Sequence, residues 1–383
     1  MLIVGITVYY GIDREEESST SPSARLFYTG CADEGIAGTG ARWGEDPRSE
    51  TSNRKRASLA LGRTHEPRDG RGDKSAGGVV HILMQWRLIL GTMALPLAMG
   101  ACVLVASSPK GESPTPVPLP RPDHIVIVIE ENHSYSQIID SPHAPYINEL
   151  AAKGALFTQS FGITHPSQPN YLALFSGSTQ DITDNSCPHT LTTPNLGHAL
   201  LAAGLTFAGY SEDLPSAGSV TCKDGSYARK HNPWVNWQNS STNGLPAEIN
   251  LPLTSFPADY GALPTVSIVV PNQVNDMHHG KDPEAIQTGD RWLRDHVEAY
   301  VQWAQQHNSL LIVTWDEDND NAKENNRIVT LFVGPMVNPG RYDQRITHYN
   351  VLRTIEDLYG LSHSGASADA EPITQIWKVP TNP

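Results

Sequence analysis

The chain has 383 residues, of which 39% are hydrophobic and 18% charged, an ordinary composition for a soluble protein. The negative charge is concentrated in residues 122–383, which carry 13 Lys and Arg against 28 Asp and Glu. Such an acidic surface argues against nucleic acid as a partner and against electrostatic binding over a wide area of an anionic membrane. An anionic substrate would need local positive charge, from a metal or from a few Lys and His.

The N-terminal part divides into three segments by composition. Residues 1–83 have few aromatics and no lasting period, so we expect a disordered stretch or a spurious upstream extension of the reading frame. The run 84–108, "MQWRLILGTMALPLAMGACVLVASS", has the layout of a secretory signal peptide; a membrane anchor, or a lipoprotein signal modified at Cys102, is the alternative. Residues 109–121 form a Pro-rich linker. We therefore expect a secreted or cell-envelope protein.

Residues 122–383 are predicted to form a single α/β domain. Strands alternate with helices, which indicates a sandwich of a mostly parallel sheet with helices on both faces. In the second helix we expect Thr193 as N-cap and Pro194 at the first helical position. Buried β-branched runs predict strands and amphipathic runs predict helices, at 124–132 (strand), 144–154 (helix), 193–204 (helix), 205–213 (strand), 264–272 (strand), 284–306 (helix), 309–318 (strand), 327–334 (strand) and 347–360 (helix).

The stretch 164–178, "THPSQPNYLALFSGS", places polar residues and two prolines in front of an apolar run. The apolar run predicts a buried helix, and Ser167 lies at its start. A helix N-terminus offers free N–H groups and a positive dipole to an anion. Ser167 is therefore the best-placed nucleophile, although Thr164 and Ser176 stay open as alternatives on the residues alone.

Two cysteines, Cys187 and Cys222, lie in polar loops of the predicted domain. An even pair in an exported domain predicts a disulfide, with two free thiols as the alternative. A bond closing a loop of this size stabilises by ~3–4 kcal/mol.

Acids, amides and histidines follow several of the predicted strands. The carboxyl ends of parallel strands meet at one edge of a sheet, so these side chains are expected to converge there. Crowded carboxylates repel one another and raise each other's pKa, a conflict that a divalent cation removes. Hard oxygen ligands and imidazoles suit several ions, so the metal's identity stays open. A metal beside a serine activates the hydroxyl for attack. The candidate ligands are Glu131, Asn132, Asp316, Glu317, His278 and His348.

Taken in order, the motifs of residues 122–378 resemble the phosphoesterase family, which includes bacterial acid phosphatases and phospholipases C, and within it the small secreted acid phosphatases. The resemblance implies an alkaline-phosphatase-like α/β sandwich and a metal-assisted phosphoserine intermediate. It is carried by "HIVIVIEENHSYSQII", "THPSQPNYLALFSG", "YSEDLP", "YARKHNPWVNW", "PNQVNDMHHG", "LLIVTWDEDND" and "HYNVLRTIEDLYG".

The same resemblance implies roles for individual residues. Ser167 would be the nucleophile. His278 would contact the phosphate or protonate the leaving oxygen, with Asp276 orienting it. Larger relatives have two aspartates where this chain has Asp316 and Glu317. The remaining roles would be metal ligation by Glu131, Asn132, Asp316 and Glu317, and substrate binding by Asn170, Lys230, His231 and His348.

We thus expect an exported acid phosphatase that hydrolyses phosphate monoesters, either small esters or phosphoinositide headgroups, and no stable protein partner. A phospholipase C-type phosphodiesterase is the second reading; such relatives carry long insertions and an extra C-terminal region, whereas this chain ends soon after "PITQIWKVP". A non-catalytic phosphate- or lipid-binding protein is the third, and the presence of Ser167 beside the acidic ligands argues against it.

Overall fold

A computed structural model of the chain describes residues 119–379. The predictions for residues 1–83 and 84–108, and for all but the end of the 109–121 linker, lie outside the described residues. Within residues 119–379, no helix has the length and apolar character needed to cross a membrane.

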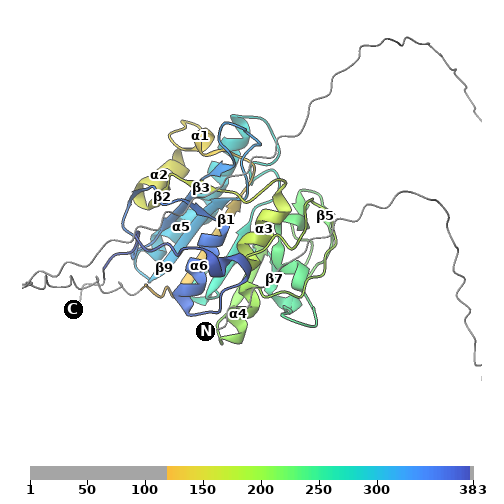
Figure 1. The fold of residues 1–383 in the computed structure, drawn as a ribbon. Coiled ribbons are helices and arrows are strands. Elements are labelled where there is room, and N and C mark those ends of the chain that lie inside the picture. The colour runs from red at the N-terminus through yellow and green to blue at the C-terminus, as the bar shows by residue number, and fades with distance from the viewer. Residues whose placement is uncertain (1–118, 380–383) are drawn as a thin grey trace, which may run out of the picture. The chain divides into compact units, whose positions relative to one another are not determined.

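An eight-stranded sheet lies at the centre of the domain (Figure 1). Its order is β12-β2-β11-β9-β1-β8-β4-β7, and only the two pairings of β11, with β2 and β9, are antiparallel. The sheet is therefore mostly parallel, as predicted. Its strands are β1 His124–Glu130, β2 Ala155–Phe157, β4 Phe207–Ser211, β7 Asn250–Pro252, β8 Val266–Val270, β9 Ser309–Trp315, β11 Thr330–Val333 and β12 Gly340–Tyr342.

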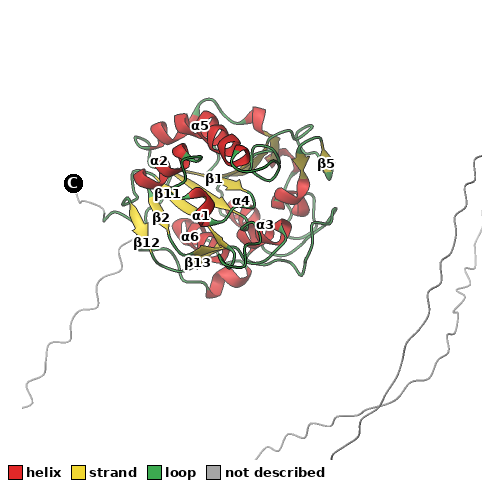
Figure 2. Ribbon diagram, turned by 90° about the horizontal axis from the view of Figure 1, so that it is seen from above, coloured by secondary structure: helices red, strands yellow, loops and turns green. Residues whose placement is uncertain are grey.

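Helices cover both faces of this sheet (Figure 2). On one face lie α2 (Pro145–Lys153) and the long amphipathic α5 (Glu284–Ala304). On the other lie α3 (Ser167–Ser176), α4 (Leu196–Ala202) and α6 (His348–Tyr359). This confirms the predicted α/β sandwich. The smaller elements are α1 Tyr135–Ile138, the strands β3 Ser160–Phe161, β10 Arg327–Ile328 and β13 Ile346–Thr347 of a second sheet, the hairpin β5 Lys223–Asp224 and β6 Tyr227–Ala228, and the 3₁₀ turns η1 Arg229–His231, η2 Pro233–Trp237, η3 Ala247–Ile249, η4 Leu253–Ser255, η5 Tyr260–Ala262 and η6 Gly365–Asp369.

Two hydrophobic cores flank the sheet, and the alternation along β1 assigns its side chains to them. Ile125, Ile127 and Ile129 belong to the core under α3, α4 and α6, whereas Val126 and Val128 belong to the core under α5. Side chains alternate along a strand, and each fully buried Ile or Val adds about 1.5–3 kcal/mol to the free energy of unfolding, so the register of β1 is strongly fixed.

The helix at 193–204 begins later than predicted. Asn195 is the N-cap of α4, and its Oδ1 accepts the backbone N–H of His198 at 2.8 Å. The expectation of a Thr193 cap was therefore wrong, because the Asn side chain supplies the acceptor two residues further on. The strand predicted at 327–334 is also divided, into β10 of the small sheet and β11 of the large one.

The disulfide between Cys187 and Cys222 is confirmed, with Cα atoms 5.9 Å apart. It joins the loop after α3 to the hairpin that precedes η1. Near Cys187, Asn185 Oδ1 accepts a hydrogen bond from the backbone N–H of Gln168 at 2.9 Å. At Cys222, the backbone carbonyl accepts a hydrogen bond from the backbone N–H of Arg229 at 3.0 Å. The bond therefore ties the start of α3 to the segment that begins η1.

Candidate active site

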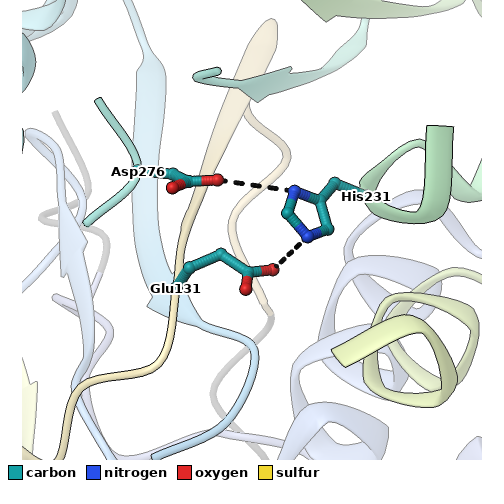
Figure 3. A group of neighbouring side chains, drawn as sticks. All are labelled: Glu131, His231 and Asp276. Carbon is teal, nitrogen blue, oxygen red and sulfur yellow. Dashed lines mark ion pairs between the residues drawn. The ribbon is translucent and has the colours of Figure 1, made fainter. Parts of the chain in front are cut away.

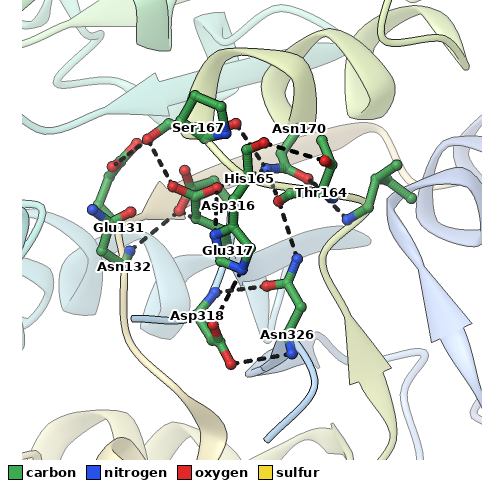
Figure 4. A network of polar contacts seen from close by, with 12 residues as sticks. Glu131, Asn132, Thr164, His165, Ser167, Asn170, Asp316, Glu317, Asp318 and Asn326 are labelled. Atoms are coloured by element: carbon green, nitrogen blue, oxygen red, sulfur yellow. Dashed lines mark hydrogen bonds and ion pairs between the residues drawn. The ribbon is translucent and has the colours of Figure 1, made fainter. Parts of the chain in front are cut away.

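Ser167 is the first residue of α3 and is 1% exposed. Its Oγ lies 3.1 Å from Glu131 Oε2 and 3.2 Å from Glu317 Oε1, with hydrogen-bond geometry toward both (Figure 4). Neither Thr164 nor Ser176 has such partners: Thr164 donates to the carbonyl of His165, and Ser176 donates to that of Leu172 inside the helix. Of the three hydroxyls considered from the sequence, only that of Ser167 faces the acidic residues.

Asn170, one turn into α3, braces the loop that leads to Ser167. Its Oδ1 accepts the backbone N–H groups of Ile163 and Thr164 at 2.8 and 3.1 Å. Its Nδ2 donates to the carbonyl of Thr164 at 2.8 Å and to Glu317 Oε2 at 3.1 Å. The amide lies in the site as expected, but its bonds go to the protein, and its contact with a phosphate stays a prediction.

The acidic pair after β9 is buried beside Ser167. Asp316 Oδ1 accepts the backbone N–H groups of Glu317 at 2.6 Å and Asn132 at 3.2 Å, whereas its buried Oδ2 has no partner. Burial raises the pKa of Asp316 well above its usual range, and the charges of Glu131 and Glu317 raise it further. Burial, and then the charge of Glu131, raise the pKa of Glu317 to about 8. The protein alone therefore does not stabilise these carboxylates as anions.

The side chain of Asn132 gives a direct test of whether a cation fits here. Its oxygen faces two acceptors, Glu131 Oε2 at 3.1 Å and Glu317 Oε1 at 3.2 Å; with the amide turned over, its nitrogen would donate to both. The first orientation brings together the oxygens of four residues, counting the Ser167 hydroxyl, in the manner of ligands around a hard cation. The buried and partnerless Asp316 Oδ2 leaves one further oxygen available beside them, so these residues suit a hard cation, and metal binding by Glu131, Asn132, Asp316 and Glu317 stays a prediction.

A second group of possible ligands lies on the other side of Glu131, with His231 and Asp276 (Figure 3). Glu131 Oε1 is 2.8 Å from His231 Nε2, and Asp276 Oδ2 is 3.4 Å from His231 Nδ1. Neither contact has hydrogen-bond geometry, so we treat both as electrostatic. Ligand atoms from the three buried residues lie within 4.8 Å of one another, so this group also could hold a metal.

The charges within this second group support one another. Burial alone would lower the pKa of His231. The charge of Glu131 and the contact between His231 and Asp276 outweigh burial, so the pKa of His231 is raised. Burial alone would raise the pKa of Glu131, but His231, followed by Lys230 and His278, brings it well below its usual range. Burial raises the pKa of Asp276 to about 6. The protonated form of His231 and the ionised form of Glu131 therefore stabilise each other.

Lys230 lies close to both Ser167 and His278. Lys230 Nζ lies 3.4 Å from Ser167 Oγ and 3.3 Å from His278 Nε2. Burial, more than any charge, lowers the pKa of His278 to about 4, so the ring is neutral at pH 7 and its Nε2 accepts from the ammonium. Asp276 Oδ1 accepts the backbone N–H of His278 at 2.8 Å. Asp276 thus holds the backbone at His278, and its role in orienting that residue for catalysis stays a prediction.

His348 lies under the acidic pair at the start of α6. Its Nε2 is 2.7 Å from the carbonyl oxygen of Asp316, and burial lowers the pKa of this histidine to about 4. The neutral ring therefore donates to the backbone of the turn that carries Asp316 and Glu317. It belongs to the site, as expected, and its contact with substrate stays a prediction.

Two contacting residues were not assigned a role from the sequence. His165 Nδ1 lies 3.1 Å from Glu317 Oε2, and its Nε2 lies 3.4 Å from Asp318 Oδ1. The ring of Tyr171 stacks on that of His231, with centroids 5.0 Å apart. Of the two, only Tyr171 could have been placed near the site from the sequence, because it stands four residues after Ser167 and therefore lies on the same face of α3.

The chain matches the phosphoesterase family over residues 139–362, and thus over more than half its length. The chain belongs to the phosphoesterase family. One relative is the phosphatidylinositol-3-phosphatase of Mycobacterium tuberculosis, which is 51% identical over 257 residues; the match covers 66% of this chain and 82% of that protein. The family membership inferred from the motifs is therefore confirmed.

More distant relatives of this phosphoesterase include an acid phosphatase of Aspergillus fumigatus, 28% identical over 232 residues. That match covers 56% of this chain and 51% of the fungal protein, so the chain spans about half the length of that relative. Among solved structures, a protein of the alkaline phosphatase superfamily from Vibrio parahaemolyticus is 12% identical, with a TM-score of 0.47, and the match covers 67% of this chain and 72% of that one.

Proposed function

We propose that this phosphoesterase is a phosphomonoesterase of the acid phosphatase type, with Ser167 as its nucleophile and phosphoinositide headgroups among its substrates. One observation carries the proposal: the Ser167 hydroxyl lies at a helix start between buried acidic oxygens and the Lys230 ammonium. The names of the relatives, a phosphatidylinositol-3-phosphatase and an acid phosphatase, support the substrate class.

The divalent ion would be held by Glu131, Asn132, Asp316 and Glu317, the residues whose oxygens converge beside Ser167. When bound, it supplies positive charge that lowers the pKa of the serine hydroxyl and offsets charge on the phosphoryl oxygens. The second group, Glu131 with His231 and Asp276, is the place for another ion or for a positively charged His231. The metal's identity is the open part of the proposal.

The remaining steps follow from the chain's own side chains. The Ser167 hydroxyl donates its proton toward the carboxylate oxygens of Glu131 and Glu317, and its oxygen attacks phosphorus. The Lys230 ammonium stabilises the negative charge that develops on the Ser167 oxygen and on the phosphoryl oxygens during attack. The P–O bond to the alcohol breaks, and water later cleaves the phosphoserine to release phosphate and restore the hydroxyl.

His278 is placed to deliver a proton to the departing alcohol. Its Nε2 lies 3.3 Å from Lys230 Nζ, and the side chain is 23% exposed, on the open side of the site. The ring is neutral before substrate binds, and a phosphate dianion favours its protonation. A protonated ring beside the ester oxygen would act as general acid.

Export from the cytoplasm is part of the same proposal. The disulfide between Cys187 and Cys222 supports it, because such bonds persist in oxidising compartments. N-terminal sequencing of the protein from its native source tests this directly: a mature start after residue 102 is expected, and a start before Met84 would contradict it.

The deciding experiment is a panel of phosphate monoesters and diesters, each assayed with purified protein before and after chelation and again after adding divalent ions. We expect turnover of monoesters that falls on chelation and returns with one particular ion. Faster turnover of diesters would instead identify a phospholipase C-type phosphodiesterase, and turnover of neither would favour a binding protein.

A further inference from the structure

The turn that follows β1 carries the candidate metal ligands Glu131 and Asn132, and the next residue, His133, takes no part in the steps above. The side chain of His133 is buried, with 7% of its surface exposed. A buried polar side chain is costly unless it is hydrogen-bonded, so its partners indicate what it does there. Both ring nitrogens of His133 have an oxygen partner, and the two partners lie on different loops.

The first partner is the backbone of the turn itself. His133 Nδ1 lies 2.9 Å from the carbonyl oxygen of Glu131, and a carbonyl can only accept, so Nδ1 donates. Asn132, between them, has a φ of 51°, a left-handed conformation that costs free energy and persists where surrounding bonds hold it. The N–H of Glu131 donates to the Asp276 carbonyl at 2.8 Å. The N–H of Asn132 donates to Asp316 Oδ1 at 3.2 Å. His133 binds the carbonyl that stands between these two N–H groups in the chain.

The second partner is a carboxylate on another loop. His133 Nε2 lies 2.9 Å from Asp282 Oδ1, and Asp282 Oδ2 accepts from Gln137 Nε2 at 2.9 Å. Gln137 is itself held in place, because its Oε1 accepts the backbone N–H of Ser134 at 2.9 Å. The Asp282 carboxylate is thus bound through both oxygens to residues 133–137, which sets its orientation as well as its position.

These contacts fix both ends of the loop that carries His278. Residues 276–282 are tied to the turn after β1 twice. At the start, the Asp276 carbonyl accepts from the N–H of Glu131, and at the end Asp282 contacts His133. His278 lies between the two ties, with its Nε2 3.9 Å from Glu131 Oε2. The separation of His278 from the Glu131 carboxylate therefore depends on both ties.

We propose that His133, anchored by Asp282, is a positioning residue that holds the Glu131 turn and the His278 loop in the arrangement that the reaction needs. The inference rests on the proposed function, because it identifies what aligns a candidate metal ligand with the candidate general acid. Each of the two residues acts through another, His133 through the backbone of Glu131 and Asp282 through the loop of His278. Such partners matter because a small misplacement of a reacting group costs much of the rate.

Two substitutions of His133 separate its two bonds. The amide nitrogen of His133→Asn stands near the place of Nδ1, so this variant keeps a donor to the Glu131 carbonyl and loses the contact with Asp282. The longer side chain of His133→Gln reaches the place of Nε2, so this variant keeps the contact with Asp282 and loses the donor to the carbonyl. Asp282→Ala removes the same tie as His133→Asn. Its side chain is 41% exposed, so this variant tests the tie even where a His133 variant fails to fold.

Loss of the tie to Asp282 should impair proton delivery more than attack. For His133→Asn and Asp282→Ala, we expect kcat for glycerol phosphate to fall about tenfold or more and kcat for p-nitrophenyl phosphate about threefold or less, with KM little changed. The two substitutions combined should cost no more than either one, because both remove one contact. The control is Asp295→Ala on α5, an exposed acid paired with Arg294, for which both esters should stay within about twofold of the unmodified protein's values.

Loss of the bond to the Glu131 carbonyl should instead weaken metal binding. Mg²⁺, Mn²⁺, Ca²⁺ and Zn²⁺ are each titrated alone into the chelated protein and followed by calorimetry. For the ion that supports turnover, we expect His133→Gln to raise Kd about tenfold and His133→Asn to leave it within about twofold. Turnover of both esters by His133→Gln should recover at high concentrations of that ion.

Two results would overturn the inference. One is an equal loss on both esters in His133→Asn, His133→Gln and Asp282→Ala together with a lowered melting temperature, which would show that the cluster only supports the fold. The other is no change of turnover or metal binding in any of the three. If the unmodified protein hydrolyses neither ester with any of the four ions, the proposed function fails and this inference with it. If it hydrolyses both esters and either overturning result is found, only the inference fails.

Discussion

The ammonium nitrogen of Lys230 lies 3.4 Å from the hydroxyl oxygen of Ser167. A fixed positive charge at this distance stabilises the serine oxygen as it loses its proton and the phosphoryl oxygens as they gain charge. Lys230→Met should therefore lower kcat/KM for p-nitrophenyl phosphate by about 10²–10³-fold while the fold is retained. The control is Lys223→Met, on the exposed hairpin strand β5. Equal effects of the two substitutions would show that only general charge matters.

Ser167→Ala should reduce turnover of p-nitrophenyl phosphate by at least about 10³-fold, because it removes the hydroxyl that bonds to both Glu131 and Glu317. The control is Ser176→Ala in the same helix, whose hydroxyl donates to the carbonyls of Leu172 and Ser178 and accepts from Gln180 Nε2, away from the acidic residues. Circular dichroism and melting temperature check the fold. A Ser167→Ala protein that retains activity would remove Ser167 as the nucleophile.

Asp316→Asn tests the proposed metal site with little change of shape. Both backbone N–H bonds to Asp316 go to Oδ1, which an asparagine keeps, so the substitution removes only the charge and the partnerless Oδ2. We expect bound metal, measured by elemental analysis, to fall together with activity by about 10²-fold or more. Full metal content and full activity in this variant would contradict the assignment.

The chelated protein should become less stable as the pH rises. Burial and Glu131 raise the pKa of Glu317 to about 8, so its stabilising contribution is present below the ordinary carboxyl pKa and is lost as the pH rises through about 8. Asp276, with its pKa raised to about 6, acts in the same direction, whereas the lowered pKa of Glu131 matters only in stronger acid. His278 and His348, whose pKa values burial lowers to about 4, act in the opposite direction below about pH 6.5. Melting temperature should therefore fall most clearly between about pH 6.5 and 8 after chelation, and less so with metal or in Glu317→Gln. An unchanged melting temperature across this range would contradict the prediction.

His278→Asn should separate proton delivery from attack. Alkyl phosphates need a protonated leaving oxygen, whereas p-nitrophenolate leaves readily without one. We expect kcat for glycerol phosphate to fall by about 10²–10³-fold and kcat for p-nitrophenyl phosphate by about tenfold or less. His279→Asn, at the adjacent position, is the control. Equal losses on both substrates would show that His278 binds the phosphate instead.

The Cys187–Cys222 bond should contribute to both stability and alignment. It spans a sequence separation of 35 residues, for which loop closure gives about 3–4 kcal/mol of stabilisation. The double variant Cys187→Ser/Cys222→Ser should lose about this free energy of unfolding in a urea titration, and its kcat should fall because the start of α3 and the segment before Lys230 are no longer linked. If the double variant were as stable as the unmodified protein, the two loops would keep their structure without the disulfide.

Local patterns predicted the elements of the fold, and strand alternation accounts for part of the site. Ser167 does begin a buried helix, and odd-numbered residues of β1 face that helix, so Glu131 meets Ser167 while Glu130 is buried elsewhere. The partners within the site were harder to predict. Asp276 holds the backbone of His278 and faces the ring of His231, a choice set by loop packing. His165 could not be assigned because its partners stand some 150 residues away.

β11 runs antiparallel to β9, so the segment that joins them, 316–329, leaves and rejoins the sheet at the same end; it contains a loop, 316–326, and then strand β10 of the small sheet. Its first two residues, Asp316 and Glu317, are fixed by β9, while residues 318–326 contribute to the walls of a hollow of about 750 Å³. Exposed loop tips commonly tolerate insertions and deletions, so we expect changes of length at 320–325 to leave the acidic pair in place. One short segment thus joins a part whose position the sheet dictates to a part whose length is free to vary.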